Sequence, residues 1–235
     1  MIPQRTSGEL PAWTARALGY VFVNPALCEM ALTHRSAGSC HNERLEFLGD
    51  AVLNCTVARL LYEAHPKADE GALSRQRASL VSGETLAQIA ADLGLGDCLR
   101  LGGGELKTGG FRRASILADA LEAVLGAIFL DSGYAAVNGV VRHILGTRLS
   151  ELPPASELKD PKTRLQEALQ GRGMALPLYE LTGVAGEAHE QSFTVSCDVP
   201  SLKLKSVGAG VTRRRAEQEA AERLLAQLPA DMQKI

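Results

Sequence analysis

The stretch NERLEFLGDAVL, residues 42–53, decides how the N-terminal part of this chain folds. Residues at i, i+3 and i+7 share one face of a helix, so three acids would form a single stripe: Glu43, Glu46 and Asp50. Apolar Phe47 and Leu53 flank the stripe, and we expect them to place the carboxylates at the edge of a hydrophobic core. Like charges this close repel, so the stripe needs a compensating partner.

A second pair of acids, Asp119 and Glu122, lies at i, i+3 within residues 115–130, where nearly every other residue is apolar. Burial of unpaired carboxylates is costly unless protons or a cation neutralise them. Carboxylate ligands favour a hard ion, which predicts Mg²⁺, with Mn²⁺ able to substitute. The alternative is that Glu43 and Glu46 form surface salt bridges and that Asp119 caps a neighbouring group.

The overall composition sets limits on the class of protein. With 235 residues, 46% hydrophobic and 4% aromatic, the chain is typical of a globular protein whose cores are aliphatic and largely helical. A net charge of −2 gives no global reason to expect a polyanion partner, so any nucleic-acid site must come from local clusters. The five scattered cysteines predict reduced thiols and a cytoplasmic protein. We expect no membrane association, because the N-terminus lacks a signal-peptide pattern and residues 115–130 fall short of the about 20 residues of a membrane span.

Two domains are predicted. Residues 1–149 form an all-α domain, because apolar residues recur there mostly at helical spacing. Residues 150–159, which contain Pro153 and Pro154, form a linker. Residues 160–229 form a small α+β domain in the order α-β-β-β-α, with a helix at 160–172, strands at 178–184, 191–199 and 202–206, and a last helix with an apolar face from Ala216 to Leu225.

Three consecutive arginines, Arg213, Arg214 and Arg215, occupy the predicted first turn of the last helix, after Thr212 as a possible cap. The helix dipole disfavours cations there, which suggests a functional reason for them. Phosphate at that turn would satisfy both the arginines and the free backbone amides. A solvated basic turn is the alternative.

These segments resemble the ribonuclease III family. Residues 42–53 look like its signature, and the similarity continues through residues 31–36 (ALTHRS), 69–81 and 115–133. The domain order resembles the short bacterial form, which implies an all-α ribonuclease III catalytic domain followed by a double-stranded-RNA-binding domain. The implied activity is hydrolysis of double-stranded RNA by metal-activated water, leaving staggered ends with 3′ overhangs, in ribosomal RNA precursor processing and turnover of structured messages.

Carried over by position, the resemblance implies four catalytic magnesium ligands: Glu46, Asp50, Asp119 and Glu122. Glu43 and Glu70 match the outer acids of the family, whose expected role is RNA positioning, a further metal interaction or the subunit interface. One acid cluster for each chain, set against two RNA strands, implies a twofold homodimer.

For RNA binding, the resemblance implies that the first helix of the second domain and the turn before its second strand enter successive minor grooves. By position this implicates Thr163, Gln166, Glu167, Gln170 and His189. The segment GGGELKT (102–108) lacks a glycine before Lys107, so a nucleotide-binding loop and a nucleotide cofactor are not expected. Lys107, Arg112 and Arg113 could instead contact the RNA backbone, although a solvated basic loop explains them equally well.

Other interpretations stay open. His34 and Ser36 could suggest a nucleophilic pair, but their spacing does not place them on one helical face, so we expect a structural role. The chain could also be a catalytically silent RNA-binding protein of the same fold, or a metal hydrolase acting on free nucleotides. The intact set of four acids favours a nuclease over the first, and the C-terminal domain disfavours the second.

Overall fold

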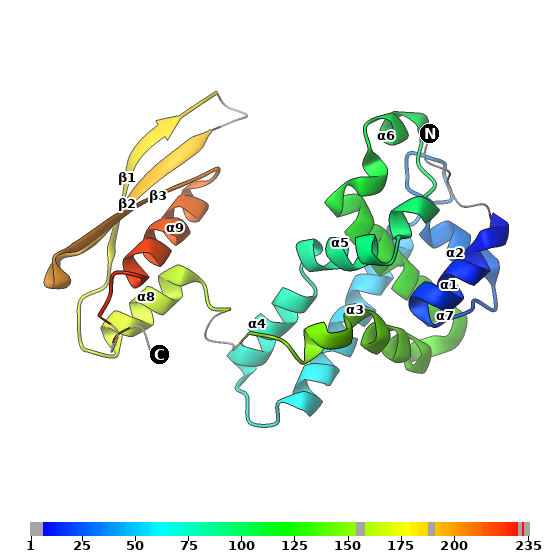
Figure 1. Ribbon diagram of the computed structural model, residues 1–235, viewed down its shortest axis with the longest axis horizontal. Coiled ribbons are helices and arrows are strands. Elements are labelled where there is room, and N and C mark those ends of the chain that lie inside the picture. The colour runs from blue at the N-terminus through cyan, green and yellow to red at the C-terminus, as the bar shows by residue number, and fades with distance from the viewer. Residues whose placement is uncertain (1–6, 154–157, 188–190, 230–231, 233–235) are drawn as a thin grey trace. The chain divides into compact units, whose positions relative to one another are not determined.

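A pair of long helices, α3 (Glu43–Ala64) and α7 (Ala114–Leu145), forms the centre of the N-terminal half of the chain (Figure 1). This computed structural model describes residues 7–153, 158–187, 191–229 and 232, and the chain divides into two compact units, Met1–Pro153 and Pro154–Ile235. Part of the predicted linker, residues 154–157, lies outside the described residues. The elements of the first unit are helices, as predicted, and the shorter ones are α1 (Leu10–Leu18), α2 (Pro25–Ala31), α4 (Glu70–Leu80), α5 (Gly83–Asp92) and α6 (Gly103–Lys107).

Helices α3 and α7 approach each other closely because glycine lies at the crossing on both sides. A Cβ atom at Gly49 would lie 1.8 Å from the carbonyl oxygen of Glu122, and one at Gly126 would lie 2.2 Å from the carbonyl oxygen of Leu45. No side chain fits into such gaps, so the backbones themselves are in contact. The acids of the two helices are thereby brought to one place.

Around this crossing, aliphatic residues of α3, α5 and α7 form the core of the first unit, and Leu53, Leu121 and Leu125 are almost completely buried. Helix α7 is kinked at Gly133, whose φ of 77° lies in the left-handed region. Next to the kink, the carboxylate of Asp131 accepts hydrogen bonds from the Tyr20 hydroxyl (2.6 Å) and from the backbone N–H groups of Val23 and Asn24 (both 2.8 Å). Across the described part of the chain, the helices are either too short or too polar to cross a bilayer.

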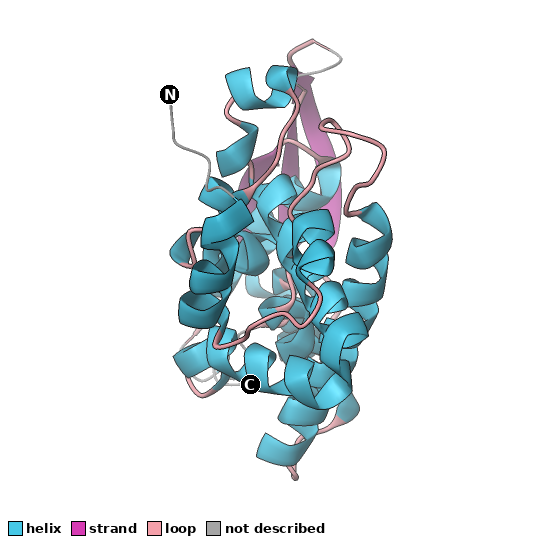
Figure 2. Cartoon of the chain, turned by 90° about the vertical axis from the view of Figure 1, so that its right-hand side faces the viewer, coloured by secondary structure: helices cyan, strands magenta, loops and turns pink. Residues whose placement is uncertain are grey.

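The second unit has the predicted order α-β-β-β-α, and its strands make up one sheet (magenta in Figure 2). Its elements are α8 (Pro161–Gln170), β1 (Leu178–Ala185), β2 (Ser192–Val199), β3 (Leu204–Gly210) and α9 (Arg213–Leu225). The sheet is antiparallel in the order β1-β2-β3. A core that includes Leu165, Leu169, Cys197 and Leu224 joins both helices to the sheet.

Three details of the sequence interpretation were wrong. Phe47 was expected beside the core, but its side chain is 79% exposed, whereas Leu53 is buried as expected. The third strand begins at Leu204, because Pro200–Leu202 forms a 3₁₀ turn and Lys203 adopts a left-handed conformation. The segment treated as a glycine-rich loop contains the short helix α6.

The glycine crossing gives the first prediction. Gly49→Ala should lower the melting temperature of the protein strongly, because the new methyl group would collide with backbone that cannot move aside, at a cost of about 1–3 kcal/mol or more. Thermal unfolding followed by circular dichroism measures this effect.

Gly139→Ala is the matched control, since this exposed glycine of α7 has no heavy atom within 4 Å of the added Cβ. That control should be neutral or stabilising, because alanine is favoured over glycine inside a helix. Equal melting temperatures for Gly49→Ala and the parent protein would contradict the proposed packing constraint.

Candidate active site

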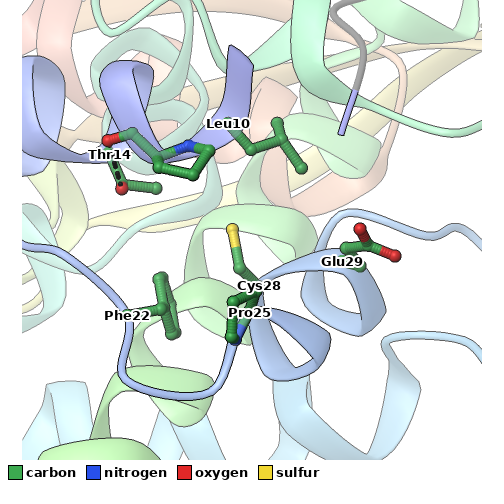
Figure 3. Close-up of a pocket in the computed structure, with 7 residues that line it drawn as sticks. Leu10, Thr14, Phe22, Pro25, Cys28 and Glu29 are labelled. Atoms are coloured by element: carbon green, nitrogen blue, oxygen red, sulfur yellow. Dashed lines mark hydrogen bonds between the residues drawn. The ribbon is translucent and has the colours of Figure 1, made fainter. Parts of the chain in front are cut away.

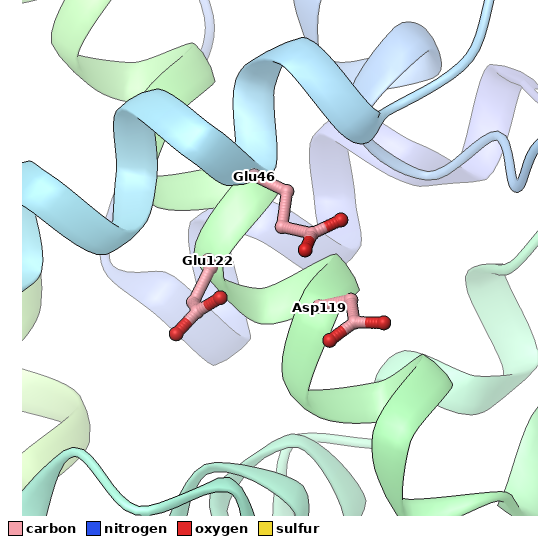
Figure 4. A group of neighbouring side chains, drawn as sticks. All are labelled: Glu46, Asp119 and Glu122. Atoms are coloured by element: carbon pink, nitrogen blue, oxygen red, sulfur yellow. The ribbon is translucent and has the colours of Figure 1, made fainter.

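Three carboxylates from the two central helices converge on one point (Figure 4). Glu46 extends from α3, and Asp119 and Glu122 extend from α7. Each offers one oxygen, and these oxygens lie within 4.8 Å of one another. All three residues are partly buried. Within the described residues this is the one group of three or more His, Cys, Asp or Glu ligands that lie so close together.

The surroundings disfavour negative charge on this cluster. Burial, followed by the charges of Asp50, Asp119 and Glu46, raises the pKa of Glu122 to about 7. Burial is also the main cause of a raised pKa at Glu46 and at Asp119, and at Asp119 the charges of His34 and Arg35 oppose the shift. Three acidic oxygens without a thiol or imidazole suit a hard divalent cation, which would remove their repulsion.

Asp50, the fourth predicted ligand, does not belong to this group of three. Its side chain is exposed, and one carboxylate oxygen accepts a hydrogen bond from the Asn54 amide at 2.8 Å. It is nevertheless close enough to Glu122 to be the largest electrostatic contributor to that raised pKa. Asp50 therefore lies beside the cluster, one helical turn beyond Glu46.

Neither outer acid belongs to the group of three, although Glu43 lines the pocket beside it and its charge helps to raise the pKa of Glu46. Glu43 is exposed and forms an ion pair with Arg35 (3.2 Å), and its other carboxylate oxygen lies 3.7 Å from the imidazole Nδ1 of His41. Glu70 is the exposed first residue of α4, and its carboxylate accepts a hydrogen bond from the Ser74 hydroxyl at 2.7 Å.

A polar pocket adjoins the cluster on the side of Glu46 and Asp119, and its basic wall is formed by His34, Arg35 and Arg113. Sequence reasoning gave Arg35 no role, although it lies in the ALTHRS segment that carried part of the resemblance. Arg113 forms an ion pair with Glu105 at 2.9 Å. Glu43 and Glu105, the ion-pair partners of Arg35 and Arg113, line the same pocket, so these cations approach the acids in paired form.

His34 and Ser36 meet in a loop, since the imidazole Nδ1 lies 2.8 Å from the Ser36 hydroxyl oxygen. That hydroxyl also accepts a hydrogen bond from the backbone N–H of Gly102 at 2.9 Å. The N–H of His34 donates to the carbonyl of Arg100, and the N–H of Arg100 donates to Leu32. His34 and Ser36 thus connect the loop after α2 to the start of the 103–113 segment through hydrogen bonds. Their role is structural.

A second recess, between α1 and α2, has a different character (Figure 3). Its lining is mainly apolar and includes Leu10, Phe22 and Cys28. Burial raises the pKa of the Cys28 thiol to about 12, so this thiol stays protonated and unreactive. The carboxylate of Glu29 at its edge forms an ion pair with Arg100 at 3.2 Å. The recess lacks the convergent polar groups of a reaction site.

The residues predicted to bind RNA in the second unit differ in their exposure and in whether they are paired with another side chain. Thr163, Gln166 and Gln170 are exposed along one face of α8. Glu167 forms an ion pair with Lys159. His189 lies outside the described residues.

The arginine turn and the basic loop are at the surface. Arg213, Arg214 and Arg215 are exposed in the first turn of α9, and the Thr212 hydroxyl accepts a hydrogen bond from the Arg215 N–H at 3.2 Å, which confirms the predicted cap. In the first unit, Lys107 and Arg112 are exposed, and the Arg112 guanidinium lies 5.0 Å from the centroid of the Phe111 ring.

Comparison with known proteins agrees with both halves of this description. Residues 24–149 match the family described as Ribonuclease-III-like, and residues 161–228 match the double-stranded RNA binding motif. Ribonuclease 3 of Thiobacillus denitrificans is 57% identical over 93% of this chain and 97% of its own length, and that of Vibrio vulnificus is 55% identical over 91% and 95%. The nuclease domain of ribonuclease III from Campylobacter jejuni is 42% identical and covers 57% of this chain and 94% of its own, with a TM-score of 0.56.

A helical domain with an acidic cluster, joined to a double-stranded-RNA-binding domain, defines a class of nucleases that cut duplex RNA. The matches extend over nearly the whole chain and over nearly the whole of the relatives. The chain belongs to the ribonuclease III family. Its activity is that of an endoribonuclease specific for double-stranded RNA.

The raised pKa values give a prediction for the metal-free protein. Because the folded-state pKa of Glu122 (about 7) lies above its ordinary value of 4.5, its contribution to stability is full below pH 4.5 and is lost as the pH rises through about 7. In EDTA at pH 8, Glu122→Gln should therefore be more stable than the parent, by on the order of 1 kcal/mol after allowance for solvent screening. Thermal unfolding from pH 4 to pH 8 measures the difference.

At pH 4 the two proteins should melt alike, because Glu122 is then protonated and resembles glutamine in charge. Addition of Mg²⁺ at pH 8 should stabilise the parent more than the variant. A difference in melting temperature between parent and variant that does not change with pH would contradict a raised pKa at Glu122.

Proposed function

We propose that Glu46, Asp119 and Glu122 bind the catalytic Mg²⁺, with Asp50 as an additional ligand at its edge. The observation that supports this most strongly is the convergence of three acidic oxygens at a place where burial and mutual repulsion raise the pKa of Glu122 to about 7. When bound, Mg²⁺ supplies a Lewis acid that lowers the pKa of water and stabilises negative charge on the phosphodiester. Mn²⁺ offers similar chemistry to carboxylate ligands.

The side chains of the protein do the positioning. Asn54 holds one oxygen of Asp50, which leaves the second oxygen for the proposed ligand role. Glu46 and Glu122, held at the glycine crossing, present their oxygens from two different helices. Arg35 and Arg113 line the adjoining pocket, where their charge would favour the phosphates that flank the bond being cut.

The proposed active form is a homodimer that associates through an apolar surface next to the acids. This surface is lined by Leu27, Met30, Phe47, Leu48 and Leu130, and Phe47 and Leu130 are 79% and 56% exposed. Exposure of a phenylalanine within such a patch is unusual for a monomer and typical of an interaction site. The similar Campylobacter jejuni domain has been described as having a region involved in dimer formation.

Dimerisation would set two acid clusters against the two strands of a duplex. A twofold axis relates the antiparallel strands of RNA, so two equivalent sites would make two staggered cuts, which we infer leave 3′ overhangs. Glu43 lines both the apolar surface and the polar pocket beside the acids, which favours an interface role for this outer acid. Glu70 is proposed to support RNA positioning.

The proposed RNA contacts follow from the exposure of Thr163, Gln166 and Gln170 and from the family resemblance for Glu167 and His189. Thr163, Gln166, Glu167, Gln170 and His189 would address the 2′-hydroxyl groups of the minor grooves, which distinguishes RNA from DNA. The three arginines of α9, with Lys107 and Arg112, would bind phosphates. Processing of ribosomal RNA precursors and decay of structured messages are the proposed cellular tasks. All five cysteines have free thiols, as is usual in a reducing compartment, and we infer that the enzyme acts in the cytoplasm.

Removal of one central acid should separate cleavage from binding. Glu122→Gln should reduce cleavage of long duplex RNA in Mg²⁺ by about a hundredfold or more, because loss of a ligand weakens or displaces the ion. Affinity for the same duplex, measured by filter binding in Ca²⁺, should change little.

Glu84→Gln is the control, because Glu84 is an exposed acid at the start of α5 and the same charge is removed. This control should cut RNA at the parent rate. Full activity of Glu122→Gln would contradict the proposed metal site, and equal loss in both variants would point to a general effect of charge.

Removal of the exposed aromatic ring should weaken self-association. Phe47→Ala should shift the protein from dimer toward monomer at micromolar concentration, as seen by analytical ultracentrifugation, because it removes the most exposed apolar group of the patch. Tyr62→Ala is the control, since Tyr62 is 73% exposed on the same helix but does not line the patch. A monomeric parent protein with full activity would rule out the proposed assembly.

A further inference from the structure

An acidic side chain stands among the cations of the proposed RNA-binding surface. Glu217, in the second turn of α9, accepts a hydrogen bond from Lys162 of α8 (2.5 Å) and another from Arg213 of its own helix (3.0 Å). Its side chain is only 13% exposed. The carboxylate is thus largely covered from water, whereas Lys162 and Arg213 are 35% and 60% exposed, so solvent screens the two ion pairs in part.

A second interaction connects the N-terminal ends of α8 and α9, and here the acid belongs to α8 and the donor to α9. Asp160 caps α8 by accepting a hydrogen bond from the N–H of Lys162, and its other oxygen accepts one from the Gln218 amide of α9 at 2.5 Å. Arg214 lies 3.8 Å from the same carboxylate. Each helix thus supplies an acid that binds a donor of the other helix.

Lys162 is held from a third side, because its ammonium group lies 4.6 Å from the centroid of the Tyr179 ring. The ammonium group therefore contacts both an aromatic ring and a carboxylate, and these two contacts fix its position at the start of α8. Burial raises the pKa of Glu217, but the hydrogen bonds from Lys162 and Arg213 outweigh that effect, and the pKa lies below its ordinary value. Glu217 is thus an anion that the surrounding residues hold in place.

We propose that Glu217 is a positioning residue for RNA binding, which fixes the groove-facing side of α8 relative to the arginine turn of α9. The inference rests on the RNA-binding surface proposed above. The exposed residues Thr163 and Gln166 lie one and four positions after Lys162 on α8, and the exposed Arg214 and Arg215 lie three and two positions before Glu217 on α9. The ion pair between Glu217 and Lys162 therefore connects the two sets of contacts that must match the spacing of one duplex.

The inference predicts an effect opposite in sign to that of simple electrostatics. Loss of a negative charge from a surface that binds a polyanion should strengthen binding if charge alone matters. If Glu217 positions the contacts, Glu217→Gln should instead weaken binding of the full-length protein to duplex RNA by about fivefold, since couplings within ion-pair networks are commonly near 1 kcal/mol. Filter binding at several salt concentrations gives both the affinity and its salt dependence.

Glu222→Gln is the matched control, because Glu222 is an exposed acid of the same helix whose loss removes the same charge. This control should bind RNA as tightly as the parent or slightly more tightly. Equal or tighter binding by Glu217→Gln would overturn the inference. Melting curves of each variant identify any that unfold under the binding conditions.

A double-substitution cycle keeps the test decisive even if Glu217→Gln lowers stability. In a Lys162→Met background, Glu217→Gln should have little further effect on affinity, because the pair through which it acts is already lost. Fully additive effects of the two substitutions would contradict a shared role.

Simultaneous replacement of Arg213, Arg214 and Arg215 by alanine tests the proposed RNA-binding surface separately from the positioning role of Glu217. That variant should bind weakly and with a flatter salt dependence. If its binding is unchanged, the proposed RNA-binding surface itself is wrong. If its binding falls while Glu217→Gln binds normally, only the positioning role of Glu217 is wrong.

Discussion

Backbone contact between α3 and α7 is the constraint on which the catalytic unit depends. The carbonyl oxygens of Leu45 and Glu122 occupy the space where side chains of the opposite helix would otherwise be, so both Gly49 and Gly126 are required. Glu46 lies three residues before Gly49, and Glu122 lies four before Gly126, so both acids share the face that carries the contact. The distance between the helices therefore sets the distance between the carboxylates.

This packing assembles groups that repel one another. Burial raises the pKa of Glu46, Asp119 and Glu122, so the aliphatic core beneath them supplies the stability that the acids remove. The basic wall of the neighbouring pocket opposes these shifts only in part, through Arg35 at Glu46 and through His34 and Arg35 at Asp119. A bound cation would then serve both the chemistry and the fold.

Sequence periodicity predicted features that a single element determines, whereas the expectation that acids of two helices share one site came from the family resemblance. The acidic stripe, the helix cap at Thr212 and the α-β-β-β-α order follow from local spacing. Phe47 was misplaced because the side of α3 that faces α7 is set by Gly49, and residues two positions apart on a helix point in nearly opposite directions. Likewise Lys162 and Glu217 lie 55 positions apart, so no local pattern could connect them. The separation of Asp50 from the other three acids also depends on how two helices cross.

The clamp formed by Ser36 and Gly102 has a consequence for how such an enzyme can diversify. It closes the base of the 103–113 excursion with hydrogen bonds that involve neither the central acids nor the tip that carries Lys107 and Arg112. Insertions, deletions or new charges at that tip would leave the acids of α3 and α7 in place, whereas changes at Glu105 or Arg113 of the same segment would alter the pocket beside them. The residues at the tip that are proposed to contact RNA can therefore change without a change in the acids that are proposed to bind the metal.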